Sequence, residues 1–132
     1  MRDVLKYQLP PLLWILVTLI FAYFPDLYFS IKLPLGTDKI VHAGVYFILC
    51  WLVQRAFYKQ AALLQLRKSS FLGAFIFSCV YGILDEFHQH FLPGRRSNVY
   101  DLLAAAGGAL LYVAIASMVS RREDGAGSEP KS

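Results

Sequence analysis

Charged side chains are scarce in this chain. Only 17% of its 132 residues are Asp, Glu, Lys or Arg, whereas 57% are hydrophobic. The mean hydropathy is correspondingly high, at +0.48. Soluble domains carry about 25% charged residues, so a chain with so little charge cannot cover the surface of a water-soluble globule of this size. The composition therefore predicts an integral membrane protein.

Reactive groups and recognised catalytic motifs are also few. The two cysteines, Cys50 and Cys79, fall in apolar stretches, where a thiol behaves as a small hydrophobic group, so we predict that both serve packing. There is no glycine-rich phosphate loop and no His-Glu-x-x-His zinc motif. Ser97 has no assigned neighbouring base, and Ser78 lies deep in an apolar stretch. The remaining catalytic chemistry for which the sequence supplies every group is the activation of water by a carboxylate.

Long apolar stretches make up most of the chain. At a rise of about 1.5 Å per residue, each can approach or span a hydrocarbon core of about 30 Å. The predicted fold class is all-α, an integral membrane bundle of four transmembrane helices in a single domain over residues 1–122. Residues 123–132 are Gly, Ser, Pro and charge, and are predicted to form a disordered cytoplasmic tail. The four stretches are Leu9–Phe24, Lys39–Trp51 or a turn beyond, Phe71–Phe91 and Tyr100–Val119.

The distribution of Lys and Arg predicts the topology. Nine of these residues lie at the termini and in the connection 55–70, against four in the other two connections. Because cytoplasmic loops carry the excess of positive charge, both termini and the second connection are predicted to be cytoplasmic, with residues 25–38 and 92–98 outside. The net charge of +4 reflects this bias. It gives no reason to expect a nucleic-acid partner.

Polar residues from three predicted helices meet at the outer edge of the bilayer. With Thr37 as N-cap, the second helix places its first polar residues there, and the fourth helix, starting near Ser97 or Asn98, adds an aspartate in its first turn. Charge in lipid is costly and usually has a function. The residues so placed are Asp38, Lys39, His42, Asp85, Glu86, His88, Gln89, His90 and Asp101.

Helical spacing divides these residues among faces. Asp38 and His42 share one face because they are four residues apart. Not every side chain at the end of the third helix can point inward, so we expect either Asp85 or Glu86 to face the bundle and the other to reach the interface. A buried imidazole at His42 needs a partner, most simply Asp38 or Glu86.

The motifs Asp38-Lys39-x-x-His42, Asp85-Glu86-Phe87-His88-Gln89, Pro93-Gly94-Arg95 and Asp101, followed by a small-residue helix, resemble the VanZ-like family of small bacterial membrane proteins, which is associated with teicoplanin resistance. The resemblance covers residues 38–113 and implies a multi-pass protein of the bacterial inner membrane, with no settled reaction. One departure is Ala105, where the family commonly has asparagine. If that asparagine is part of a site, either the site is altered in this chain or Asn98 fills the role. The family's polar signature falls on Asp38, Lys39, His42, Glu86, Gln89, Arg95 and Asp101.

Three uses of these residues are open. In the first, Glu86 and His42 act as general base and acid in a hydrolase- or transferase-like site, while Arg95 and Arg96 clamp a phosphate or carboxylate. The other ligand-binding residues would be Asp38, Lys39, His88, Gln89 and Asp101. In the second, which is the minority alternative, His42, His88, Glu86 and Asp101 hold a divalent metal; otherwise no cofactor is expected. In the third, the charges pair among themselves and tie the second, third and fourth helices together.

The first use is the favoured hypothesis. The expected ligand is an anionic outer-leaflet molecule, such as a membrane lipid or a lipid-linked cell-wall precursor, with an effect on glycopeptide susceptibility; binding and catalysis both stay open. The alternative is a non-catalytic structural or accessory protein that contacts a protein partner. Simpler roles also exist for single residues. Asp101 can complete an N-cap box with Asn98, and Arg95 and Arg96 can anchor a loop at the headgroups.

Overall fold

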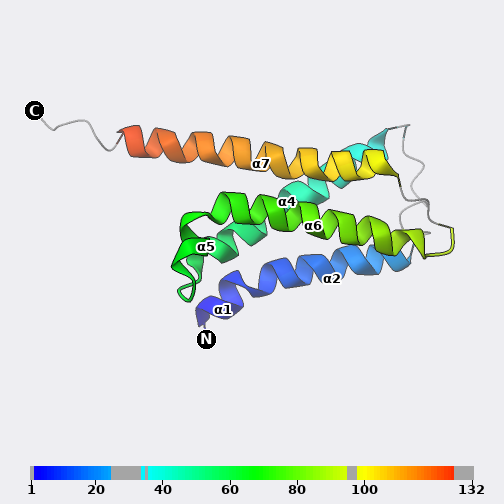
Figure 1. Ribbon diagram of the computed structural model, residues 1–132, viewed down its shortest axis with the longest axis horizontal. Coiled ribbons are helices and arrows are strands. Elements are labelled where there is room, and N and C mark those ends of the chain that lie inside the picture. The colour runs from blue at the N-terminus through cyan, green and yellow to red at the C-terminus, as the bar shows by residue number, and fades with distance from the viewer. Residues whose placement is uncertain (1, 25–33, 35, 95–97, 127–132) are drawn as a thin grey trace, which may run out of the picture.

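A computed structural model describes residues 2–24, 34, 36–94 and 98–126, and within those residues helices joined by short connections are present and no strand (Figure 1). Helices of the described chain run nearly alongside one another, with the short α5 in the connection that joins α4 to α6. The elements are α1 (Arg2–Tyr7), α2 (Leu9–Tyr23), α4 (Thr37–Lys59), α5 (Leu64–Lys68), α6 (Ser70–His90) and α7 (Val99–Ala126).

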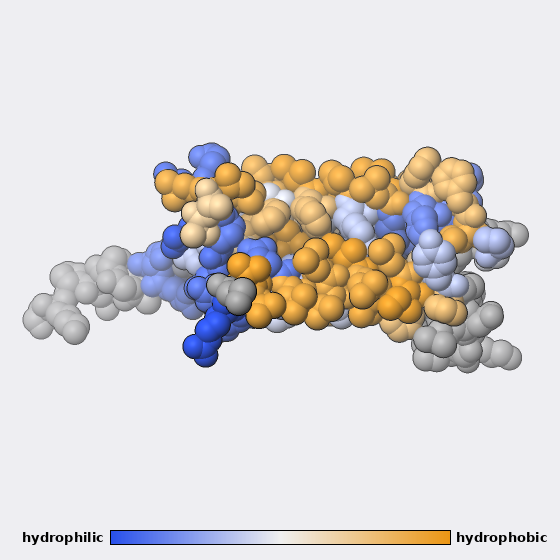
Figure 2. Space-filling model, turned by 90° about the horizontal axis from the view of Figure 1, so that it is seen from below, coloured by the Kyte–Doolittle hydropathy of each residue, from blue (hydrophilic) through white to orange (hydrophobic). Residues whose placement is uncertain are grey.

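Among the described residues, four helical segments are long and apolar enough to cross a membrane: Arg2–Tyr23, which joins α1 and α2, then Thr37–Lys59, Ser70–His90 and Val99–Asp124. The predicted all-α bundle of four membrane-spanning helices is therefore confirmed. The face drawn in Figure 2 matches this environment, since apolar residues cover most of its middle and hydrophilic residues gather toward its ends. Leu72, Ile76 and Val80 of α6 are exposed, although their side chains are large and apolar.

Three predicted boundaries are corrected. Gly36, with φ of 92°, holds the N-cap position of α4, so Thr37 is the first helical residue and not the cap. A positive φ of this size suits glycine, which has no β-carbon. Helix α4 continues to Lys59, well beyond Trp51. Helix α7 continues to Ala126, so residues 123–126 belong to a helix and not to a disordered tail.

Helices α4, α6 and α7 form the core of the bundle. Leu49 of α4 and Ala74 of α6 are fully buried there, together with Ala109 of α7. Small residues let the backbones approach closely, and Gly108 of α7 lies against the backbone of Ala43 in α4. Lipid provides no hydrophobic driving force between helices, so close packing of this kind has to hold them together.

Helix α2 is attached to this core by hydrogen bonds. The Trp14 indole N–H donates to the carbonyl oxygen of Val45 in α4, at 3.1 Å. The hydroxyls of Thr18 and Tyr81 lie 2.8 Å apart and join α2 to α6. Both contacts cross between helices at the depth of the membrane, where water cannot replace them. They fix the rotation of α2 against its neighbours.

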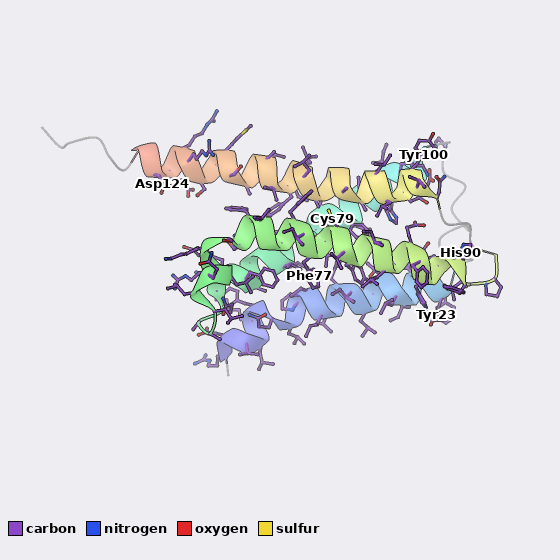
Figure 3. The ribbon with its side chains drawn as sticks, in the orientation of Figure 1. Tyr23, Phe77, Cys79, His90, Tyr100 and Asp124 are labelled. Atoms are coloured by element: carbon purple, nitrogen blue, oxygen red, sulfur yellow. The ribbon has the colours of Figure 1, made fainter. Side chains whose placement is uncertain are left out.

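The start of α1, the end of α7 and the helix α5 all lie at one end of the bundle (Figure 1). Asp124 marks that end in Figure 3, and His90 and Tyr100 mark the opposite one. The chain thus passes from one end of the bundle to the other an even number of times, as the predicted topology requires. The positive residues counted in the sequence concentrate at the end with α5, which we predict to be cytoplasmic.

Cysteine labelling tests that orientation. A cysteine at Pro93 should react with a membrane-impermeant maleimide added to intact cells, and one at Ala61 should not, because residues 92–98 are predicted to lie outside and the connection before α5 inside. The parent chain is the control, since Cys50 and Cys79 lie within helices. Labelling at Ala61 with protection at Pro93 would invert the topology.

Candidate functional site

The end of the bundle opposite α5 gathers polar side chains from α4, α6 and α7. Figure 3 shows it at the ends of α2 and α6 and the start of α7, where Tyr23, His90 and Tyr100 are labelled. We call the following set the polar cluster: Asp38, Lys39, His42, Tyr46, Asp85, Glu86, Gln89 and Asp101. Apart from Tyr46, its members lie near helix ends that are far apart in the sequence, at positions that the sequence analysis placed at this surface.

Asp85 is held between α4 and its own helix. Its side chain is buried, at 6% exposure, and its Oδ2 accepts hydrogen bonds from the Tyr46 hydroxyl at 3.1 Å and from Gln89 Nε2 at 3.0 Å. The His42 ring packs on the ring of Tyr46, with 5.1 Å between centroids. Tyr46 therefore contacts both the histidine and the carboxylate. The expectation that Asp38 or Glu86 is the polar partner of His42 stays a prediction.

Glu86 joins the end of α6 to the start of α7. It is 8% exposed, and its Oε2 accepts the backbone N–H of Asn98 at 3.1 Å. Asn98 itself caps α7, because its Oδ1 accepts the backbone N–H of Tyr100 at 3.0 Å. Asp85, Asp101 and Lys39 all lie within electrostatic range of the Glu86 carboxylate.

The expectation that only one of Asp85 and Glu86 faces the bundle was wrong, since both are buried. Successive residues of a helix point about 100° apart. Helix α6 packs against both α4 and α7, so Asp85 meets α4 while Glu86 meets the residue that precedes α7. Two adjacent carboxylates are thereby enclosed at one level of the bundle.

Lys39 connects α4 to α7. Its Nζ lies 2.5 Å from Asp101 Oδ1 and 3.0 Å from Asp38 Oδ2. Asp101 thus pairs with a lysine, and the cap of α7 comes from Asn98. The side chain of Asp38 is about half exposed, so this part of the polar cluster opens to the surface.

His88 and the remaining predicted residues lie elsewhere. His88 turns toward α2, where its Nε2 is 3.1 Å from the Tyr23 hydroxyl, and His90 packs on Phe91. Arg95 and Arg96 lie outside the described residues. Within the described ranges no three His, Cys, Asp or Glu side chains are grouped so as to hold a metal ion.

Two atoms of the polar cluster have unused hydrogen-bonding capacity. Oδ1 of Asp85 and Oε1 of Glu86 are buried, and neither has a hydrogen-bond partner in the part of the chain that the structure describes. Buried polar atoms are nearly always paired, and a carboxylate can accept about four hydrogen bonds. These two oxygens are therefore the places where a ligand or a water molecule would bind.

Sequence reasoning missed Tyr46 and the hydrogen-bonded pair Tyr23–His88. A signal for Tyr46 did exist, because it lies one turn after His42 on the same face of an apolar helix. Tyr23 had no such signal, since its partner is on another helix.

Ala105, where the resemblance leads one to expect asparagine, lies in the apolar core beneath the polar cluster. It is 2% exposed, and a β-carbon on Gly82 would lie 3.6 Å from its own. The same β-carbon would lie 3.3 Å from Cε1 of Tyr46. Position 105 thus packs against Gly82 of α6, which Tyr46 also contacts. Asn98 contributes its backbone N–H to Glu86 instead.

A family model described as VanZ/LLP1 matches residues 3–120, which extends the resemblance through α1 and α2 to nearly the end of α7. No curated protein and no solved structure is significantly similar to the chain.

Proposed function

This chain belongs to the VanZ/LLP1 family of membrane proteins, and we propose that its polar cluster is a ligand site at the outer face of the bacterial inner membrane. The ligand is an anionic molecule of the outer leaflet, such as a lipid-linked cell-wall precursor. The family is associated with teicoplanin resistance, so the proposed consequence of this activity is a change in glycopeptide susceptibility.

The observation that carries the proposal is the pair of buried carboxylates with unpaired oxygens. In a purely structural pair the charged groups contact each other, as Lys39 does with Asp38 and Asp101. Asp85 and Glu86 instead fix one oxygen each and leave the other buried without a partner among the described residues. Such an arrangement costs stability unless something binds there.

Glu86 suits the role of a base in this site. The Asn98 N–H fixes Oε2, which leaves Oε1 to take a proton from a bound hydroxyl or water. The oxygen that loses this proton would attack a phosphorus or carbonyl centre of the ligand. His42, held against Tyr46, would return a proton to the departing oxygen. If the site binds without reacting, the same oxygens accept hydrogen bonds from the ligand's hydroxyls or amides.

Positive charge for the anionic part of the ligand would come from the connection between α6 and α7. The described part of the polar cluster is acidic, because Lys39 is its one Lys or Arg beside Asp38, Asp85, Glu86 and Asp101. Arg95 and Arg96 shortly precede Asn98, whose N–H contacts Glu86. Guanidinium groups bind phosphate or carboxylate in a bidentate manner, which a lysine cannot reproduce.

The second candidate function is structural, and two contacts favour it. Lys39–Asp101 joins α4 to α7, and Tyr46–Asp85 joins α4 to α6. In this case the polar cluster would fix the three helices, and the protein would act by contacting a larger envelope enzyme.

Glu86→Gln separates the two functions. Glutamine keeps an acceptor for the Asn98 N–H and the shape of the side chain, but it cannot take a proton or carry charge. We expect a variant that accumulates normally in the membrane and has lost its effect on teicoplanin susceptibility. The measurement is the minimal inhibitory concentration in a strain carrying this chain alone, together with the amount of protein in the membrane.

Glu123→Gln is the matched control, because it makes the same chemical change at an exposed residue at the far end of α7. It should behave like the parent, whereas Arg95→Lys should be impaired. A Glu86→Gln variant that works normally, or that fails only because it does not accumulate, would establish the structural function.

A further inference from the structure

A groove opens at the end of the bundle where α5 lies, far from the polar cluster. It has a volume of about 380 Å³ and is bounded by residues of α4, α5, α6 and the last part of α7. This size is within the range of ligand pockets in proteins, about 300 to 1,000 Å³. The polar side chains that line it are Gln54, Tyr58, Arg67, Lys68, Ser70 and Ser120.

Two adjacent cations, Arg67 and Lys68, line the groove, and no Asp or Glu does. Within the described residues, neither cation forms an ion pair with a carboxylate. The Arg67 guanidinium is instead placed over the ring of Tyr58, 5.5 Å from its centroid, which limits the orientations it can adopt. The groove therefore presents unneutralised positive charge in a partly fixed position.

Hydroxyl groups lie in the same groove beside the cations. Ser70 is only 4% exposed, and its Oγ accepts a hydrogen bond from Gln54 Nε2 at 3.2 Å. The Tyr112 hydroxyl donates to Gln54 Oε1 at 3.0 Å, which orients the amide so that its nitrogen points at Ser70. The Ser70 hydroxyl is thus left with its own hydrogen to donate. Cations and a hydroxyl donor together match the oxygens of a phosphate group.

The surroundings of the groove place it at the edge of the lipid. Leu63 and Leu64 at the start of α5 are 61% and 62% exposed, although both are large and apolar. Leu64 also lines the groove, together with Phe71 of α6. Exposed leucines next to cations are typical of a segment that lies in the interface, with apolar side chains among acyl chains and charges at the headgroups.

We propose that this groove binds the phosphate of an anionic phospholipid in the leaflet at the α5 end. Arg67 and Lys68 contact the phosphate oxygens, Ser70 donates a hydrogen bond from the floor, and the acyl chains leave past Leu64 and Phe71. The same phosphate chemistry could be offered by a water-soluble phosphate, but the apolar exit favours a lipid. The site is separate from the polar cluster and does not depend on the function proposed for it.

Lipid binding to the purified full chain in dodecyl maltoside tests the proposal. Native mass spectrometry would be used to titrate phosphatidylglycerol and phosphatidylcholine with identical acyl chains. Phosphatidylglycerol should bind at least about tenfold more tightly. Arg67→Gln with Lys68→Gln should weaken its binding by about 25-fold, which corresponds to about 5-fold for each cation near a membrane surface.

Arg121→Gln with Arg122→Gln is the matched control, since this basic pair follows Ser120 on α7 and does not line the groove. It should change phosphatidylglycerol binding by less than about twofold. Equal losses in the two double variants would show diffuse attraction to positive charge and overturn the site. Equal binding of phosphatidylglycerol and phosphatidylcholine would also overturn the site. Displacement of phosphatidylglycerol by equimolar glycerophosphate or inorganic phosphate would overturn the assignment to a lipid.

Discussion

Gly108→Ala is expected to lower the free energy of unfolding by about 3 kcal/mol, the upper part of the range for inserting a methyl group into a packed interface. A β-carbon on residue 108 would overlap the carbonyl group and Cα of Ala43 in α4. A side chain could rotate away from such an overlap, but backbone atoms cannot. Helices α4 and α7 would have to separate, which would weaken packing along their whole shared length.

Gly107→Ala provides the control for this prediction. A β-carbon on residue 107 would have nothing within 4 Å, so the same substitution one position earlier should not lower stability and, through the higher helix propensity of alanine, should raise it by up to about 1 kcal/mol. The measurement is the midpoint of unfolding in mixed micelles of dodecyl maltoside and increasing SDS, followed by circular dichroism. Identical midpoints for the two variants would show that α4 and α7 do not depend on close approach at Gly108.

The separation of α4 and α7 should also affect the polar cluster. Lys39 and Asp101 join the same two helices. Gly108 lies about two turns from Asp101 along α7, so a displacement at one position is transmitted to the other through a rigid helix. Gly108→Ala is therefore expected to weaken the Lys39–Asp101 pair without changing either residue.

Tyr46→Phe is expected to destabilise the bundle by about 1 to 2 kcal/mol. The Tyr46 hydroxyl donates to Oδ2 of Asp85, and both residues are buried. Removing the hydroxyl leaves this carboxylate with Gln89 as its one remaining hydrogen-bond donor among the described residues. The ring is retained, so its packing on His42 should persist. The loss would therefore report on the hydrogen bond and not on a cavity.

Tyr81→Phe is the matched control. Its hydroxyl bonds to Thr18, which is neutral and also bonds to the carbonyl oxygen of Ile15. Losing it should cost about 0.6 kcal/mol, the typical value for a hydrogen bond between membrane helices. Both variants would be compared by the same SDS unfolding measurement. If the two substitutions lower the free energy of unfolding equally, the Tyr46–Asp85 hydrogen bond contributes no more than the Thr18–Tyr81 hydrogen bond. Tyr46 would then not belong to the polar cluster.

Asp85 and Glu86, the two carboxylates on α6, are held in the same way. Each has one oxygen fixed by a donor from another helix or connection, Tyr46 for Asp85 and the Asn98 N–H for Glu86. Each has its second oxygen buried and unpaired among the described residues. Fixing one oxygen orients the other, which is what a site for proton transfer or ligand recognition needs.

The sequence by itself determined the number of crossings and the place where polar residues meet. A bilayer requires about 20 apolar residues per crossing, so hydropathy alone counts the helices. Every crossing ends at one of two membrane surfaces. Polar residues near the starts of α4 and α7 and the end of α6 therefore had to share one surface, which brought Asp38, Lys39, Glu86, Gln89 and Asp101 to the same end. The family resemblance rested on these same positions.

Only the tertiary structure decided which way each helix is rotated. In a soluble helix the polar face reveals the outside, but in a membrane the lipid-facing and core-facing residues are both apolar, so periodicity gives no direction. The rotation is set by contacts between distant residues, such as Gly108 against Ala43 and Trp14 with Val45. This is why the sequence could not show that Asp85 and Glu86 are both enclosed, or that His88 turns to α2.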